Sequence, residues 1–404
     1  MSVNPFKAYP LRWVGLAAAV AGVAITFAQR LDAMQNPDSI AFVALAKSVL
    51  AGTGLRYREA LIPGLDLFAF RAPAYPVFVA LGLALGGIGT VIAMQGALSG
   101  LSAALLGAIA RNLGGGPRAA WIAFAIRLAW PIAWFYSGLV LGEVFFEFLG
   151  ILATWAVLES IGRRRLAWSV LAGVSTAIAI LCRPVGLGLA LGLGIWLLLR
   201  FPRAALAYTV AALVTWAPWP IRNALVLHAF VPFTTNGNAT AWAGTTDGNV
   251  RPAYDWMGAN VRLGELGFDR HFREVTRRNI VQNPKATLKA VARRAFIYLG
   301  PIRGRAAELW VHRYAMLAAL AALILAAPRR RIVLPVMIWA AQGAIMLPIL
   351  LFDRYRFPTE WCVALAAALG IVGFAERFGM RRASIAVGLS LIVCIALSLA
   401  VARP

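Results

Sequence analysis

The chain has 404 residues, of which 61% are hydrophobic and only 14% are charged, whereas soluble globular domains carry about 25% charged residues. A soluble multidomain protein is excluded, because apolar runs of about 20 residues, long enough for a helix to cross a bilayer, recur along most of the chain. The net charge of +23 would indicate nucleic-acid binding in a soluble protein, but basic residues in the short loops of a membrane protein first report topology. We expect an all-α polytopic membrane protein with no nucleic-acid partner.

The first half of the chain predicts a transmembrane module over residues 1–221. Basic residues precede the first apolar run, so the positive-inside rule places the N-terminus in the cytoplasm and a retained first span at 12–28. A polar outer loop over 29–88 follows. Its last part, 73–88, is apolar but short, which predicts a juxtamembrane or re-entrant helix rather than a crossing. Further spans are expected near 89–110, 119–137, 140–160, 166–183, 185–199 and 204–221.

A long polar segment over 222–310 predicts an extracytoplasmic loop region. It carries thirteen Lys or Arg and six Asp or Glu. Topology does not explain this positive charge, so it favours an anionic partner such as lipid phosphate or an acidic glycan; the alternative is a solvated face attracted to anionic headgroups. Trp242 and Trp256 could stack on a sugar ring or anchor at the membrane interface. The C-terminal helices over 311–404 bring the total to about eleven, with spans expected near 311–327, 332–352, 358–375 and 384–402.

The first outer loop predicts an amphipathic interfacial helix. From Asp38 to Leu50 apolar residues recur at helical spacing, and we expect Asp38 as the N-cap and Gly52 and Gly54 just beyond the end. Such a helix would hold the Asp38 carboxylate above the membrane surface, where a general base could meet a lipid headgroup. The alternative is a plain capping aspartate.

Several charged residues fall inside predicted spans or at their ends, where an unpaired charge is costly. Glu143 lies near the outer end of its span, which favours a functional role. Arg127 lies near the middle of a span and needs a partner; Glu147 is the nearest carboxylate on the next helix, so we predict a structural ion pair. Three arginines mark predicted outer helix ends, where such side chains either bind phosphate or reach toward the interface: Arg183, Arg354 and Arg356.

The cysteines and histidines give no case for a metal centre. Cys182, Cys362 and Cys394 lie in apolar segments without metal-ligand spacing, so we interpret them as small core residues. With three histidines and no cluster with cysteine or carboxylate, zinc is not indicated. A divalent metal ion is left open, and no cofactor is assigned.

Eight groups of residues in a fixed order carry a family resemblance. They are DS, AKSVLAGTGL and RAPAYPVF in the first outer loop, then GEVFFEF, CRPVG, WPIRNALVLHAFVPFTTNG, RRNIVQNP and FDRYRFP. In this order they resemble the GT-C glycosyltransferases, the superfamily that includes the protein O-mannosyltransferases and the lipid A aminoarabinose transferases, over about residues 30–375. The chain departs from the pattern at Phe42, where many relatives carry Tyr, and at Ser39, where some carry Glu. These departures leave the acceptor class open.

The resemblance implies transfer of a sugar from a polyprenyl-phosphate-linked donor to a hydroxyl of a lipid, glycan or protein acceptor. The site would face the exterior of a bacterial or archaeal cytoplasmic membrane, among membrane lipids. Asp38 matches the position of the family's base, and Glu143 is the second catalytic candidate. The matching motifs assign the donor phosphate to Arg183, Arg354 and Arg356, and substrate contacts to Arg71, Tyr75, Asn236 and Tyr355.

Two other classes of protein share parts of this pattern. A transporter or flippase for a lipid-linked glycan would also have many spans and basic cavities. It should, however, show paired repeats and broken helices near the membrane midplane, whereas the polar residues here cluster in the outer loops. A non-catalytic membrane scaffold is the third class, and the set of carboxylates and arginines at matching outer helix ends argues against it.

Overall fold

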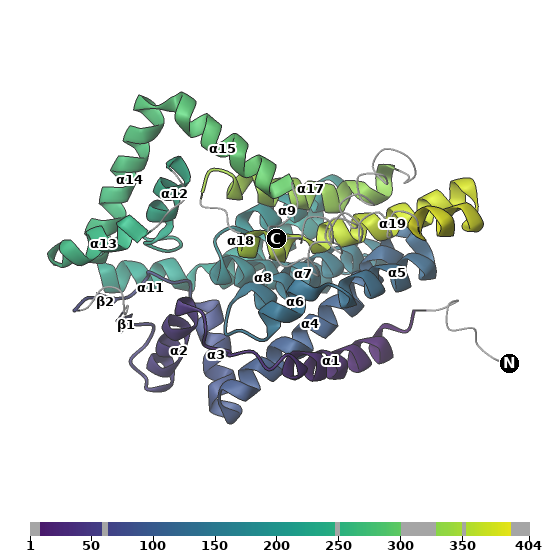
Figure 1. Ribbon diagram of the computed structural model, residues 1–404, viewed down its shortest axis with the longest axis horizontal. Helices are drawn as coiled ribbons and strands as arrows, with labels where there is room; N and C mark the ends of the chain where they lie inside the picture. Colours follow the sequence, from purple (N-terminus) through teal and green to yellow (C-terminus); the bar gives the residue numbers. More distant parts are fainter. Residues whose placement is uncertain (1–8, 59–63, 247–250, 300–328, 350–352, 389–404) are drawn as a thin grey trace, which may run out of the picture.

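The computed structural model describes residues 9–58, 64–246, 251–299, 329–349 and 353–388, which are mostly helical (Figure 1). Long helices run side by side in a bundle, which confirms the prediction of an all-α polytopic membrane protein. Among the described residues, five helical segments are long and apolar enough to cross a membrane: Leu11–Ala28, Ile88–Leu128, Glu143–Arg163, Pro202–Leu227 and Trp361–Phe378. The predicted spans 311–327 and most of 384–402 lie outside the described residues, so the number eleven stays a prediction.

The first outer loop lies between α1 (Leu11–Ala28) and α4 (Ile88–Ala110). It contains α2 (Pro37–Leu50), a two-stranded antiparallel sheet of β1 (Tyr57–Arg58) and β2 (Asp66–Leu67), and α3 (Ala74–Gly86). At about 1.5 Å per residue, the 13 residues of α3 span roughly 20 Å. That is too short to cross a bilayer core of about 30 Å, in agreement with the predicted short helix.

The prediction that Asp38 is the N-cap of its helix is wrong. The N-cap of α2 is Asn36, whose side-chain oxygen accepts a hydrogen bond from the backbone N–H of Asp38 at 3.0 Å. Pro37 occupies the first helical position, where its missing N–H costs nothing. The Asp38 carboxylate is therefore released from capping and is available for other contacts.

Two predicted single spans are broken by prolines. Residues 119–137 form the end of α5 (Gly116–Leu128) and a separate α6 (Pro131–Ser137), and residues 204–221 divide between α10 (Pro202–Trp216) and α11 (Pro218–Leu227). Proline has no backbone N–H and fits the start of a helix, so each break falls just before one. The other helices of this half are α7 (Glu143–Arg163), α8 (Leu166–Cys182) and α9 (Gly186–Arg200).

Four helices follow α11 and gather at one end of the bundle with α2, here called the outer end (Figure 1). They are α12 (Gly237–Thr245), α13 (Arg251–Ala259), α14 (Gly264–Gln282) and α15 (Pro284–Leu299). One apolar cluster joins α13 and α14 to the first outer loop, since Leu45 and Phe70 pack with Met257, Phe268 and Phe272. The chain then returns through α17 (Arg329–Met346), α18 (Asp353–Arg356) and α19 (Trp361–Phe378).

Small residues set the closest helix contacts in the bundle. On α4, a Cβ added at Gly96 or Gly100 would collide with backbone or side-chain atoms of α1, and one added at Gly173 of α8 would collide with the backbone of α10. Lipid tails are as apolar as leucine, so close backbone approach through glycine is how helices gain packing energy inside a membrane. This packing fixes the helix ends from which the outer segments emerge.

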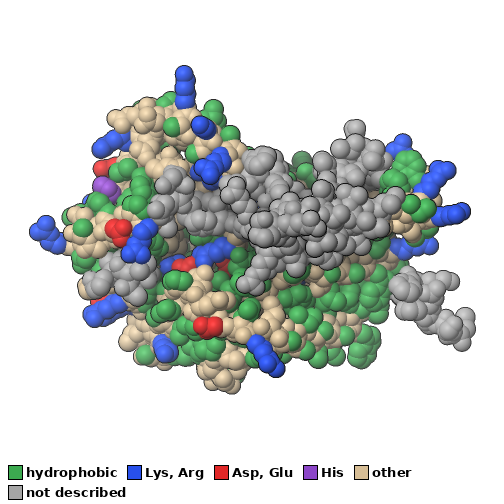
Figure 2. Space-filling model, in the orientation of Figure 1, with side chains coloured by type: hydrophobic (Ala, Val, Ile, Leu, Met, Phe, Trp, Pro, Cys, Tyr) green, Lys and Arg blue, Asp and Glu red, His purple; other side chains and the backbone are tan. Residues whose placement is uncertain are grey.

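Basic residues mark the end of the bundle that lies opposite the outer end. At the ends of α7, α9 and α19 opposite the outer end lie Arg163, Arg200 and Arg377. On the face drawn in Figure 2, hydrophobic side chains cover much of the described bundle surface, and Lys and Arg gather toward its two ends.

The predicted ion pair between Arg127 and Glu147 is confirmed. The guanidinium donates to both carboxylate oxygens, at 3.0 and 2.6 Å, and to the Ser99 hydroxyl at 3.2 Å. Both charged side chains are only 1% exposed. A charge this deeply buried persists only with a paired, hydrogen-bonded partner, so the contact ties α5 to α7.

Candidate active site

A cavity of about 280 Å³ opens at the outer end of the bundle, where five separated parts of the chain meet. These parts are α2, the segment before α3, the start of α7, the junction of α8 and α9, and the α17–α18 region, and the residues before α12 close the remaining side. The structure brings eight of the nine predicted site residues into its lining: Asp38, Arg71, Tyr75, Glu143, Arg183, Asn236, Arg354 and Tyr355.

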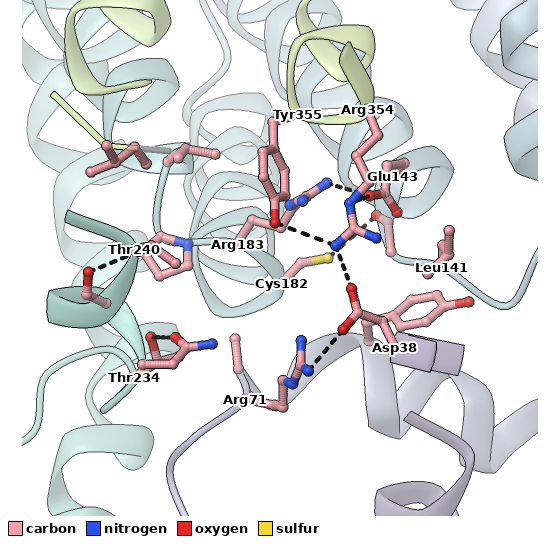
Figure 3. Close-up of a pocket in the computed structure, with 18 of the residues that line it drawn as sticks. Asp38, Arg71, Leu141, Glu143, Cys182, Arg183, Thr234, Thr240, Arg354 and Tyr355 are labelled. Carbon is pink, nitrogen blue, oxygen red and sulfur yellow. Dashed lines mark hydrogen bonds and ion pairs between the residues drawn. The ribbon is translucent and has the colours of Figure 1, made fainter. Parts of the chain in front are cut away.

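Asp38 lies in the first turn of α2 and bonds to two guanidinium groups (Figure 3). One of its oxygens is 2.8 Å from Arg71, and the other accepts a short hydrogen bond from Arg354. Burial raises the pKa of the carboxyl group, but the charges of Arg71 and Arg354 outweigh burial and hold that pKa well below its usual value. Asp38 is therefore an ionised carboxylate that remains 18% exposed toward the cavity.

Glu143 is the first residue of α7 and lies deeper than Asp38. Its side chain is 3% exposed, and one carboxylate oxygen lies 2.9 Å from Arg183 and 3.6 Å from Arg354. Helix N-termini favour negative charge, so the position at the start of α7 adds to its stabilisation. Arg354 thus bridges the two carboxylates of the cavity, one from the first outer loop and one from the bundle.

The ring of Tyr355 contacts two arginines of the cavity, Arg183 and Arg354. The guanidinium carbon of Arg183 lies 4.7 Å from the centre of the Tyr355 ring, and that of Arg354 lies 5.0 Å from it. Arg354 also donates to the Tyr355 hydroxyl at 3.3 Å. Arg183 reaches this place because it ends α8 in an extended conformation before Pro184, which prevents the helix from continuing. An aromatic face and a carboxylate hold each guanidinium in a fixed orientation.

The charged lining suits an anion. Three guanidinium groups face two carboxylates, which leaves one uncompensated positive charge. Each carboxylate oxygen that points into the cluster already contacts an arginine. Across the described residues, no three His, Cys, Asp or Glu side chains gather where they could hold a metal ion. In this structure the carboxylates are thus paired with arginines, whereas a divalent metal ion would need several free oxygen ligands.

The rest of the lining separates into an apolar wall and a neutral polar wall. Val185, Leu187, Ile345 and Met346 come from α9, the turn before it and α17, which belong to the bundle. Thr234 and Thr240 lie across the cavity at the start of α12, together with Asn236 (Figure 3). The cavity thus offers an apolar surface continuous with the membrane helices, a cationic centre and hydroxyl and amide groups toward the solvent side.

Comparison with known proteins gives a likeness of fold. No family model matches the chain, and no curated protein matches it in sequence. Among solved structures, an oligosaccharyltransferase of Archaeoglobus fulgidus in complex with Zn and sulfate matches 95% of this chain and 53% of its own length, with 14% identity and a TM-score of 0.59. A structure of the same protein tethered to an acceptor peptide gives 12% identity and 0.57, covering 99% of this chain and 54% of that one. The chain has the GT-C fold.

The match covers only part of the oligosaccharyltransferase. The chain spans about half the length of the oligosaccharyltransferase, which therefore has a large part with no counterpart here. ArnT from Cupriavidus metallidurans bound to undecaprenyl phosphate is also similar, with 15% identity over 93% of this chain and 80% of ArnT and a TM-score of 0.44. Within the GT-C fold the described segments before α3 and before α12 reach the same cavity.

One predicted phosphate-binding residue lies elsewhere in this GT-C fold. Arg356 is 1% exposed, and its guanidinium lies 3.2 Å from the buried carboxylate of Glu360, outside the lining of the cavity. Arg354 and Arg356 are two positions apart on a one-turn helix, so their side chains leave on different sides. The assignment of Arg356 to donor phosphate is corrected: in this structure it is a buried ion-pair residue beneath the cavity.

Trp242 and Trp256 are not among the residues that line the cavity. Trp242 packs on Phe272 at 5.1 Å, and Trp256 stacks on His271 at 3.9 Å. Both side chains pack against the apolar cluster of the outer helices and not into the cavity, and their role as interfacial anchors stays a prediction. Thr234 and Thr240 also line the cavity and were not predicted, although the TTNG motif marks this turn.

Proposed function

We propose that the chain is a glycosyltransferase that moves a sugar from a polyprenyl-phosphate-linked donor to an acceptor hydroxyl on the extracytoplasmic face of the membrane. One observation carries the proposal. Arg354 joins Asp38 of the first outer loop to Glu143 of the bundle in a single cavity that also has an apolar wall. A base, a cationic anion site and a surface for a lipid chain are the three features that this reaction needs.

In the proposed reaction the acceptor oxygen attacks the anomeric carbon of the sugar. The new carbon–oxygen bond forms as the bond from that carbon to the phosphate oxygen breaks, and the phosphate leaves with the electron pair as polyprenyl phosphate. Asp38 takes the proton of the acceptor hydroxyl, because it is the carboxylate exposed to the cavity. Arg354 and Arg183 stabilise the charge on the leaving phosphate.

Donor binding would prepare Asp38 for this role. Its two guanidinium partners stabilise the ionised form and make it a weak base. A donor phosphate that accepts hydrogen bonds from Arg354 replaces the carboxylate as its partner, and the pKa of Asp38 then rises toward its ordinary value. The arginine therefore couples the presence of donor to the strength of the base.

Glu143 holds the arginines and does not take part in proton transfer. It is almost fully buried and contacts both Arg183 and Arg354. A carboxylate behind two guanidinium groups fixes their orientation toward the cavity, much as hydrogen-bonded carboxylates orient the ligands of a metal ion.

The orientation of the site follows from the charge of the helix ends. The arginines opposite the cavity, such as Arg163 and Arg200, fit the cytoplasmic side by the positive-inside rule. The cavity then faces the exterior of a cytoplasmic membrane. The acceptor, whether lipid, glycan or protein, would enter past Thr234 and Asn236, which line the side away from the bundle.

The test separates transfer from transport. Sealed right-side-out vesicles would receive a polyprenyl-phosphate sugar and envelope acceptor fractions from outside only, and free polyprenyl phosphate would be measured. The proposal expects its release together with labelled acceptor. If no acceptor fraction yields polyprenyl phosphate while the intact lipid-linked sugar crosses the bilayer, the flippase explanation replaces this one.

A further inference from the structure

The backbone of Phe68 and Ala69 is held entirely by distant residues. These two residues follow β2 and precede the cavity-lining residues Phe70 and Arg71. They belong to neither a helix nor a strand, so their four backbone polar groups need partners from elsewhere in the fold.

Three residues from the 222–310 region supply those partners. One carboxylate oxygen of Glu265 accepts the N–H of Phe68 at 2.7 Å, and the other accepts the N–H of Ala69 at 2.8 Å. Arg222 donates to the carbonyl of Phe68 at 2.8 Å, and the N–H of Thr235 donates to the carbonyl of Ala69 at 3.0 Å. All four backbone groups are thereby paired.

Glu265 is the centre of this arrangement. It lies in the first turn of α14, is 4% exposed and also accepts a hydrogen bond from the Thr235 hydroxyl at 2.5 Å. Its carboxylate acts only as an acceptor in these contacts, and Thr235 stands between the cavity residues Thr234 and Asn236. The Glu265 carboxylate therefore hydrogen-bonds to Phe68 and Ala69 in one segment and to Thr235 in another. The residues next to each of these segments line the cavity.

The clamped segment determines where Arg71 lies. Ala69 and Phe70 are 0% and 1% exposed, so neither can shift without disturbing its surroundings. Two residues after the clamp, the guanidinium of Arg71 meets Asp38 at 2.8 Å (Figure 3). A displacement of about 1 Å in a positioned group can cost on the order of 100-fold in rate.

We propose that Glu265 is a positioning residue for transfer: by clamping the backbone of Phe68 and Ala69 it holds Arg71 against Asp38. This inference rests on the proposed glycosyltransfer. Glu265 touches no reacting atom, and it acts by joining α14 to the first outer loop. Arg222, the arginine of the quoted WPIRN motif, has a related role. Besides the carbonyl of Phe68, its guanidinium bonds to the carbonyl of Leu55 at 3.0 Å, so it also holds the first outer loop.

The test compares Glu265→Gln with Asp269→Asn. Both replace a buried carboxylate of α14 by an amide of the same shape, one helical turn apart. The amide NH₂ introduced at position 265 would face backbone N–H donors, whereas Asp269 bonds to the side chains of Asn238 and Arg273. We expect Glu265→Gln to lower kcat/KM for transfer about 10- to 100-fold, and Asp269→Asn to stay within about twofold of wild type because its partners are outside the clamp.

A double-mutant cycle with Arg71→Ala separates positioning from general stability. If Glu265 acts through Arg71, Glu265→Gln should have little further effect in the Arg71→Ala background. Full additivity, or equal losses in Glu265→Gln and Asp269→Asn, would overturn the inference.

Hydrogen exchange of the amides of residues 67–72 tests the clamp without any activity. Glu265→Gln should accelerate exchange there, and Asp269→Asn should not. Unchanged protection in Glu265→Gln would contradict the clamp. Faster exchange in a chain that shows no transfer at all would instead keep the clamp and refute the proposed function.

Discussion

At the scale of single residues, Arg354 decides how the cavity works. Among the described side chains of the cavity lining, it alone contacts both carboxylates and the Tyr355 hydroxyl. Burial lowers the pKa of its guanidinium, but the Tyr355 side chain and the carboxylates of Glu143 and Asp38 outweigh burial and raise that pKa, so Arg354 stays protonated at every relevant pH. A permanent planar cation between two acids is suited to exchange one carboxylate for a phosphate.

Substitution of Arg354 should weaken donor binding in graded steps. Arg354→Lys keeps the charge but loses the two-oxygen geometry, and Arg354→Ala loses both. A hydrogen bond to a charged group contributes about 1.5–3 kcal/mol, so Ala should lower donor affinity on the order of 10- to 100-fold, with Lys between. Binding would be measured in nanodiscs, with Arg251→Ala, which removes an exposed outer arginine, as the control. Equal affinity for all variants would remove Arg354 from the donor site.

The pH dependence of transfer should reveal the exchange of partners at Asp38. In the free protein the arginines hold its pKa low, so the acid limb of kcat/KM should lie at low pH. Once donor phosphate has taken Arg354, that pKa is higher, and the acid limb of kcat should lie at higher pH. The base must be ionised, so both rates fall as pH falls through the respective pKa. Coincident or reversed limbs would refute the exchange.

Some predictions about single residues followed only from the free-energy cost of an unpaired charge within a membrane span. Arg127 had to find a partner because a lone charge within a span is expensive, and Glu147 on the next helix was the predicted partner. The separate fates of Arg354 and Arg356 could not be predicted in this way, since both end the same predicted loop. Only the geometry of the short α18 decides which of them reaches the cavity.

At the scale of elements, hydrophobic periodicity located most described helices but not their breaks. Apolar runs continue through Pro131 and Pro218, so the runs appeared as single spans although proline starts a new helix at each point. The N-cap of α2 had a usable signal, because Pro37 at the first helical position designates Asn36 as the cap. The prolines therefore marked where these helices begin, whereas the apolar content of the sequence did not.

The contact between α5 and α7 should depend on both charges of the buried pair. Arg127→Met leaves the Glu147 carboxylate buried without its cation, and should lower the free energy of unfolding by about 3–5 kcal/mol. Removing both charges in Arg127→Met with Glu147→Leu should recover much of that loss, because no unpaired charge remains. Unfolding in detergent followed by circular dichroism provides the measurement. A single variant no less stable than the double would contradict a structural ion pair.

At the scale of the whole molecule, the cavity exists only because segments hundreds of residues apart converge. Asp38 and Arg354 are 316 positions apart in the sequence. Composition and periodicity predicted a membrane bundle but gave no means of joining these segments; the order of motifs shared with the GT-C glycosyltransferases supplied that link. Glu265 lies in none of the quoted motifs, which is why its clamp was found only in the structure.

The most direct measurement of the central claim is the transfer rate of Asp38→Asn beside its donor affinity. The amide keeps the shape of the side chain but cannot take the acceptor proton, so the rate should fall about 10²- to 10⁴-fold. Donor binding should be no weaker than in wild type, because Arg354 loses a competitor for phosphate. Asp32→Asn, in an exposed carboxylate of the same loop that contacts the backbone of Met34, is the matched control and should remain active. Wild-type turnover by Asp38→Asn would contradict the account and leave Asp38 as a structural ion-pair residue.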